Sequence, residues 1–269
     1  MEKYSLPCPV KNLIPHSGAM LFVDELRHVS DSGALCFYRA KHNIFSEGTF
    51  SPPLLFVELF AQSAAALAGY TAAGNSARSG FLTGIDNLNI ASPIRDGDEI
   101  NIKVRQAEQF GAVSFFECSA ESKDSAMASG TIKVWTGEIP EKKGHSISFF
   151  SHGPAEYDIL KYIKSRSCAN NSIEAMFCFE KDFCCFDGHF DGMPVVPAIA
   201  LMRASLCLAE IYSEKCFFLR KISSAKFSRR IVPGEMVRFS VSPDGVKSSV
   251  SVNGEKAASF ILELTEGVS

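Results

Sequence analysis

Two long apolar segments dominate the pattern of hydrophobic and polar positions along the chain. One covers residues 54–69 and follows Pro52 and Pro53, and the other covers residues 198–209 and follows Pro197. Proline fits the first turn of a helix, because the N–H that it lacks would have no partner there. A helix that is apolar on nearly every face belongs inside a core. The pattern therefore predicts two buried helices.

Shorter segments around these helices have the apolar alternation and the flanking turn residues of antiparallel strands. The predicted strands are residues 20–23, 34–40, 81–90, 99–106, 113–121, 126–135, 173–179, 217–222, 237–241, 248–252 and 257–264. A short helix is expected at 159–163. The chain as a whole reads as an α+β protein.

The order of elements repeats once. The proline-led helix after Pro52 corresponds to the one after Pro197, and residues 81–85 of one predicted strand correspond to residues 218–222 of another. Residues 137–145 are rich in glycine, proline and charge and read as a linker. We therefore expect two domains of one architecture, residues 1–140 and residues 146–269.

Bulk properties exclude several protein classes. The net charge of −3 argues against a nucleic-acid-binding protein. No apolar run predicts a membrane span, and the N-terminus has no signal-peptide core, so we expect a cytoplasmic protein. The nine cysteines form no CxxC pair and read as reduced thiols that pack as small apolar residues. No two histidines have the spacing of metal ligands along the chain, so no metal is expected.

Two stretches carry candidate chemistry. His189 lies in a turn marked by glycines and prolines just before the second helix, whose first N–H groups, near Ala198, could bind an oxygen that becomes negative during a reaction. Glu58 and Gln62 lie one turn apart on the first helix. A carboxylate on a buried helix is costly unless it has a partner or a task, although these two residues could also simply pair with each other or with the facing half.

The two halves differ at these positions. Alignment of Pro52 with Pro197 places Arg203 opposite Glu58, so the half with the histidine loop lacks the glutamate, and the half with the glutamate lacks the matching histidine. The remaining histidines have no such pattern and are expected to be structural: His16, His28, His42, His145 and His152.

Four motifs resemble the beta-hydroxyacyl-thioester dehydratases of fatty acid synthesis, which have the hotdog fold. Residues 188–198 are similar to the family's GHFPGxPxxPG loop, with departures at Asp191 and Ala198. Residues 58–62 match its E-x-x-A-Q helix motif, and residues 15–24 and 227–235 resemble its opening and its basic strand. The first half also resembles the histidine-lacking partner subunits of dehydratase pairs in aryl-polyene-type synthesis.

The resemblance implies a tandem (double) hotdog, in which two long central helices are each wrapped by antiparallel strands and the halves form a pseudo-dimer. It implies one live site with His189 as base, Glu58 at the leaving hydroxyl, the N–H groups near Ala198 at the thioester oxygen and Gln62 in support. The reciprocal site would place Arg203 against Ile44 or Phe45 and would be degenerate.

The implied reaction is that of a hydro-lyase, which converts 3-hydroxyacyl thioesters to trans-2-enoyl thioesters without a cofactor. The acyl group would be carried on the phosphopantetheine of an acyl carrier protein or of coenzyme A. Such a carrier could dock on a basic cluster, which could equally be a solvated strand face. The cluster consists of Arg220, Lys221, Lys226, Arg229 and Arg230.

Two other functions fit the same residues. A hotdog thioesterase could use Glu58 to activate water, and a non-catalytic acyl-thioester-binding protein would account for the departures at Asp191 and Ala198. The sequence leaves open the acyl chain length, the carrier, the pathway and further homodimerisation.

Overall fold

In the residues that the structure describes, the first half of the chain forms nine strands and one long helix. The computed structural model describes residues 4–72, 79–137, 158–169, 172–190 and 192–267. The helix of the first half is α1 (Leu55–Thr71). Its strands are β1 (Cys8–Pro9), β2 (Glu25–Val29), β3 (Gly33–Arg39), β4 (Phe50–Ser51), β5 (Ser79–Ile90), β6 (Ile94–Arg95), β7 (Glu99–Phe110), β8 (Val113–Ser122) and β9 (Ser125–Gly137).

The second half repeats this arrangement with fewer strands. Its helix is α2 (Ala198–Ser213). Its strands are β10 (Ile163–Ala169), β11 (Ser172–Cys178), β12 (Phe217–Phe227), β13 (Met236–Val241), β14 (Lys247–Val252) and β15 (Glu255–Glu266). Short 3-10 helices occur at Val10–Asn12, Gly18–Met20, Ile159–Tyr162 and Cys184–Phe186.

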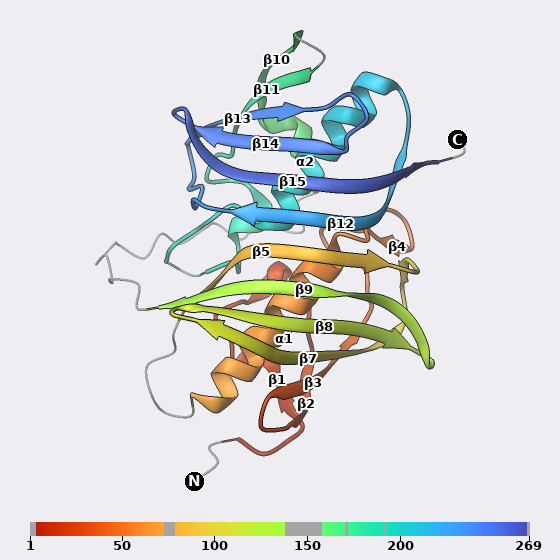
Figure 1. Ribbon diagram of the computed structural model, residues 1–269, viewed down its shortest axis with the longest axis vertical. Coiled ribbons are helices and arrows are strands. Elements are labelled where there is room, and N and C mark those ends of the chain that lie inside the picture. The colour runs from red at the N-terminus through yellow and green to blue at the C-terminus, as the bar shows by residue number, and fades with distance from the viewer. Residues whose placement is uncertain (1–3, 73–78, 138–157, 170–171, 191, 268–269) are drawn as a thin grey trace.

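Strands from both halves join into one antiparallel sheet of thirteen strands (Figure 1). Its order is β1-β2-β3-β7-β8-β9-β5-β12-β15-β14-β13-β11-β10, so the halves meet where β5 pairs with β12. In that pairing Ile85 lies opposite Ala225 and Asn89 lies opposite Lys221. Because both edge strands of the seam are paired, neither half leaves an open sheet edge there.

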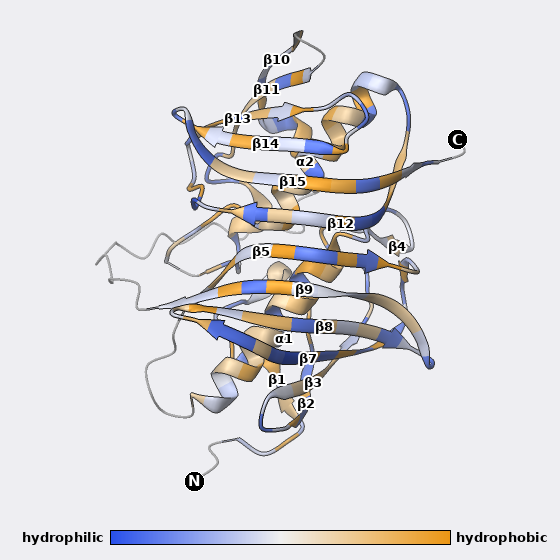
Figure 2. Cartoon of the chain, in the orientation of Figure 1, coloured by the Kyte–Doolittle hydropathy of each residue, from blue (hydrophilic) through white to orange (hydrophobic). Residues whose placement is uncertain are grey.

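Each helix packs against the strands of its own half, α1 on β3 and β7 and α2 on β11 and β13, and the two helices also touch each other. Phe56 and Phe60 of α1 and Met202 of α2 are fully buried. Figure 2 shows that both helices are predominantly hydrophobic, as the sequence pattern predicted. The α+β architecture with two buried helices and antiparallel strands is therefore confirmed.

The strand predicted at residues 20–23 is wrong. Gly18–Met20 is a 3-10 helix, and the segment that follows pairs with a side chain instead of a strand. The N–H groups of Phe22 and Val23 donate to Oε1 of Gln62 at 3.0 and 3.3 Å, and Nε2 of Gln62 donates to the carbonyl of Met20 at 2.8 Å. The side chain of Gln62 thus bonds to the backbone groups that would pair with a neighbouring strand if this segment were itself a strand.

Several other expectations are refined by the structure. The sequence pattern missed β2 and β10, which are short and largely polar. The helix predicted at 159–163 is a single 3-10 turn, and Ile163 already belongs to β10. Apart from Gly137, the predicted linker at 137–145 lies outside the described residues, as does Asp191. Among the described residues, neither helix is long and apolar enough to span a lipid bilayer.

Candidate active site

Two loops, one from each half, are joined by their backbones. The N–H of Ser17 donates to the carbonyl of Gly188 at 2.9 Å. Gly188 has a φ of +85°, and a Cβ at this position would lie 1.9 Å from the carbonyl oxygen of Ser17. Only glycine accommodates both the left-handed backbone and this close approach. The contact places His16 and His189, which neighbour the joined residues, beside each other.

The ring of His189 is fixed by one hydrogen bond. Its Nδ1 donates to the carbonyl of Val195 at 2.9 Å, which leaves Nε2 as the nitrogen able to accept a proton. The side chain is 6% exposed. Burial lowers the pKa of His189 to about 4, and the Val195 carbonyl, which favours the protonated ring, offsets this only in part. At neutral pH His189 is therefore a neutral imidazole.

Glu58 faces this histidine from α1. Its side chain is 4% exposed. Burial raises the pKa of Glu58 to about 7, and a hydrogen bond from Gln62 opposes that shift. Gln62 also holds the Met20–Val23 segment through hydrogen bonds to its backbone. A carboxyl group in this state can donate a proton near neutrality.

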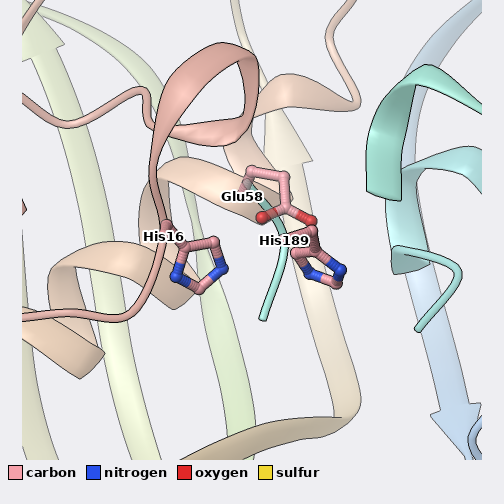
Figure 3. A group of neighbouring side chains, drawn as sticks. All are labelled: His16, Glu58 and His189. Carbon is pink, nitrogen blue, oxygen red and sulfur yellow. The ribbon is translucent and has the colours of Figure 1, made fainter. Parts of the chain in front are cut away.

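His16 is the residue that sequence reasoning did not bring to the site. A ring nitrogen of His16, a carboxylate oxygen of Glu58 and a ring nitrogen of His189 all lie within 4.8 Å of one another and form a group that could hold a metal ion. Figure 3 shows the three side chains pointing toward one another. Burial, and after it the charge of His189, lowers the pKa of His16 to about 3. Spacing along the chain did not reveal this group, because its members are far apart in sequence.

The three side chains line a cavity of about 1270 Å³, and residues of both halves contribute to its lining. Its lining includes small residues of α1 and of the position after it, aromatic residues, and the first residue of α2. The small residues are Ala61, Ala64, Ala65, Ala68, Gly69 and Ala72, and the aromatic residues are Phe81, Phe116, Trp135, Phe190 and Phe227. Side chains without bulk on α1 leave room for an extended apolar ligand.

The first turn of α2 contributes Ala198 and Leu201 to the lining of this cavity. Ala198 is the first residue of the helix and lines the cavity. The N–H groups of Ala200 and Leu201 bond to the carbonyl of Pro197 at 3.1 and 3.2 Å, so the N–H of Ala198 precedes the first intrahelical bonds. A helix N-terminus carries a partial positive charge that stabilises a nearby negative oxygen.

The predicted basic cluster is divided in the structure. Arg229 and Arg230 line the cavity, whereas Arg220, Lys221 and Lys226 do not. Arg229 is bound by Glu235 and Glu255, with its Nη2 2.7 Å from Oε1 of Glu235. The guanidinium of Arg230 lies 4.9 Å from the ring centre of Phe81. Arg230 is therefore a basic side chain in the lining of the cavity that His189 and Glu58 also line.

The reciprocal position holds two ion pairs of Arg203. Nη2 of Arg203 lies 2.7 Å from Oε1 of Glu47, and its Nη1 lies 3.0 Å from Oε2 of Glu210. Phe45, which the alignment placed near Arg203, is buried and packs against Phe22 with ring centres 6.0 Å apart. Neither Arg203 nor Phe45 can act as an acid–base group at neutral pH.

Comparison with known proteins identifies the family. A model of ApeP-like dehydratases matches residues 8–144, just over half of the chain, and a model of ApeI-like dehydratases matches residues 165–260. The chain belongs to the ApeP-like dehydratase family. The resemblance drawn from the motifs is thereby confirmed, and each half matches a dehydratase model of its own.

Curated relatives agree with this family. The 3-hydroxyacyl-[acyl-carrier-protein] dehydratase FabZ of Sinorhizobium medicae is 28% identical over 130 residues, which are 46% of this chain and 84% of the relative. The enzyme of the same name from Clostridium acetobutylicum is 31% identical over 86 residues. That match covers 27% of this chain and 61% of the relative's length.

Solved structures share the double hotdog fold over most of the chain. The dehydratase domain from the CurK module of curacin polyketide synthase has a TM-score of 0.53 at 11% identity, covering 93% of this chain and 98% of the domain. The 12:0-ACP thioesterase of Umbellularia californica has a TM-score of 0.55 at 8% identity and covers 89% of this chain and all of its own. At these identities the likeness concerns the fold alone.

The raised pKa of Glu58 predicts a pH-dependent stability. The unfolded carboxyl ionises near its ordinary pKa of 4.5, whereas the folded one keeps its proton to about 7. The stability that this group contributes is complete below pH 4.5 and declines up to pH 7, by on the order of 3 kcal/mol. The unfolding free energy of the wild type should therefore fall relative to that of Glu58→Gln across this range.

Urea denaturation at several pH values, in buffers that contain EDTA, measures this difference. His16 and His189 have lowered pKa values, so their contribution is lost as the pH falls below 6.5. Both histidines are present in both proteins, and their effect largely cancels in the comparison. Parallel stability curves for the two proteins would contradict the protonated, buried state of Glu58.

Proposed function

We propose that this protein dehydrates 3-hydroxyacyl thioesters to trans-2-enoyl thioesters. The observation that carries the proposal is the meeting of the buried side chains of Glu58 and His189, from different halves, in one cavity that the start of α2 also lines. Elimination of water needs a base for the proton on C2, an acid for the hydroxyl on C3 and stabilisation of the thioester oxygen. The site offers one group for each task.

In the proposed mechanism, Nε2 of His189 removes the proton from C2 of the substrate. Negative charge then develops on the thioester oxygen, which accepts a hydrogen bond from the N–H of Ala198. The carboxyl of Glu58 gives its proton to the hydroxyl on C3, the C–O bond breaks, and water leaves as the C2–C3 double bond forms. Near pH 6 both groups start in the required state, since His189 is neutral and Glu58 is protonated.

The site can return to its starting state without an outside group. After the elimination, His189 carries the added proton and Glu58 is ionised. The imidazolium and the carboxylate then lie within 4.8 Å of each other. Transfer of the proton from His189 to Glu58, directly or through the departing water, restores both. The reaction is acid–base chemistry throughout, and we propose that it needs no redox cofactor.

We further propose that the chain is a fused pseudo-dimer of two hotdog domains, residues 1–140 and 146–269, with one live site. The shared sheet across β5 and β12 and the two family matches support this division. The ion pairs of Arg203 at the reciprocal position support the view that the second site is degenerate.

The substrate's acyl chain would lie along α1. From Glu58 to Ala72 the small-residue wall follows the helix for about 20 Å, given a rise of 1.5 Å per residue. An extended acyl chain fits such a wall. The phosphopantetheine of a carrier protein or coenzyme A would pass Arg230, which lines the same cavity and whose guanidinium can meet a phosphate.

The two acid–base groups can be tested directly by substitution. His189→Ala should lower turnover by at least about a thousandfold, because loss of general base catalysis alone removes factors of this size. Glu58→Gln should lower it by at least about a hundredfold, because the amide cannot donate an acidic proton. His28→Ala, at an exposed position of strand β2, is the matched control and should retain normal turnover.

Mass spectrometry of the acyl thioester measures these effects. Loss of one water from 3-hydroxyacyl thioesters of several chain lengths, dependent on His189, is the expected result. Release of a free acid would indicate a thioesterase instead, although the protonated Glu58 is a poor base for activating water. Tight binding of the thioester with no chemical change would indicate an acyl-binding protein.

The position of Arg230 predicts a role in binding the carrier. Arg230→Glu should raise KM for a carrier-linked substrate by about tenfold and leave kcat nearly unchanged, because its guanidinium contacts Met193 and Phe81 and not the acid–base groups. Arg220 does not line the cavity, so Arg220→Glu serves as the charge-matched control. Steady-state kinetics with a carrier-linked substrate and with a short thioester that lacks the carrier and its phosphate separates the two effects. An equal rise of KM in both variants would assign the effect to net charge alone.

A further inference from the structure

The side chains that line the cavity include a donor set that acid–base catalysis does not require. Two imidazole nitrogens and one carboxylate oxygen, from His16, His189 and Glu58, converge within 4.8 Å of one another (Figure 3). All three residues are buried. Two histidines and one carboxylate, with the remaining position open, are a common ligand set of zinc and of other first-row transition metals.

We propose that this group binds one divalent transition-metal ion, with Zn²⁺ as the best match, and that the bound ion blocks the dehydratase site. The ion would occupy the end of the cavity between the two loops and α1. Its open coordination position would face the cavity, where a water or the oxygen of a ligand can complete the shell.

The distances require only small adjustments. An ion at the centre of three atoms that are 4.8 Å apart lies about 2.8 Å from each, and zinc bonds to nitrogen and carboxylate oxygen are about 2.0–2.2 Å long. Each donor atom would have to move by about 0.7 Å. Rotation of a side chain about its own bonds gives shifts of this size without moving the backbone.

The surroundings favour His189 and His16 as ligands. Nδ1 of His189 donates to the carbonyl of Val195, the outer contact that orients histidines at metal sites and leaves the other nitrogen free for the ion. Nδ1 of His16 is buried and has no hydrogen-bond partner among the described residues. This nitrogen of His16 is therefore available to bind an ion, although the side chain is almost completely buried.

The donor types set the selectivity. Two nitrogen ligands suit Zn²⁺, Co²⁺ and Ni²⁺ and do not suit Mg²⁺ or Ca²⁺, which prefer oxygen. An ion here would occupy Nε2 of His189 and the carboxylate of Glu58, the two groups that move protons in the proposed reaction. Metal binding should therefore compete with turnover, and it can be measured in the absence of any substrate.

Titration of the metal-free chain with Co²⁺, followed by visible absorption and then by displacement with Zn²⁺, tests the proposal. We expect one ion per chain, with ligand-field bands of a four- or five-coordinate centre, and no displacement by Mg²⁺. His16→Ala and His16→Gln should each weaken binding by at least about tenfold, since loss of even an outer partner of a ligand has that effect. His28→Ala should bind like the wild type.

The exposed cysteines provide the main alternative site. Cys168 and Cys216 are exposed thiols, and a Co²⁺ ion held by them would show strong near-ultraviolet sulfur-to-metal absorption that survives in His16→Gln. That result, or binding of no ion at all, would overturn the proposal. Neither result would bear on dehydration, which is assayed with EDTA present. With the proposal correct, stoichiometric Zn²⁺ suppresses turnover and EDTA restores it.

Discussion

The contact between Ser17 and Gly188 is the constraint on which the site depends. One backbone hydrogen bond of 2.9 Å joins loops that belong to different halves of the chain. The left-handed backbone at Gly188 and the absence of a Cβ let the loops approach closely enough for this bond to form. The residues next to the joined pair are His16 and His189, so the contact between the halves brings the two imidazoles together, and the carbonyl of Val195 orients the ring of His189.

A second constraint is the placement of a carboxyl group inside the core. Glu58 lies on a helix that is otherwise apolar, and burial raises its pKa to about 7. Gln62 limits this shift and also binds the backbone of Met20–Val23, the segment that follows His16. One amide side chain therefore couples the protonation of the acid to the position of the neighbouring loop. The apolar core raises the pKa of Glu58, and the hydrogen bond from Gln62 keeps that pKa near neutrality.

Much of the fold could be predicted from the sequence, because the evidence for it was local. Apolar runs after Pro52 and Pro197 marked both helices, and alternation marked most strands. Residues 20–23 were assigned wrongly because the partner of their backbone is the side chain of Gln62, which no local pattern reveals. The strand β10 was missed because it is a short, largely exposed edge strand with few apolar residues.

The site was only partly predictable for the same reason. His189 and Glu58 could be found because each occupies a local setting that is costly or constrained, a tight turn or a buried helix. His16 sits in an ordinary loop, and its place in the site follows from the contact between Ser17 and Gly188, far apart in the chain. The basic cluster was predicted as one surface because its residues are close in sequence, yet only Arg229 and Arg230 reach the cavity.

The central claim is that one composite site, built from both halves, holds the acyl thioester. A crystal structure of Glu58→Gln with a bound 3-hydroxyacyl thioester tests it most directly. The account predicts one acyl group per chain, with C2 near Nε2 of His189, the thioester oxygen at the N–H of Ala198 and the chain along α1. An acyl group bound at Arg203, or two acyl groups per chain, would contradict it.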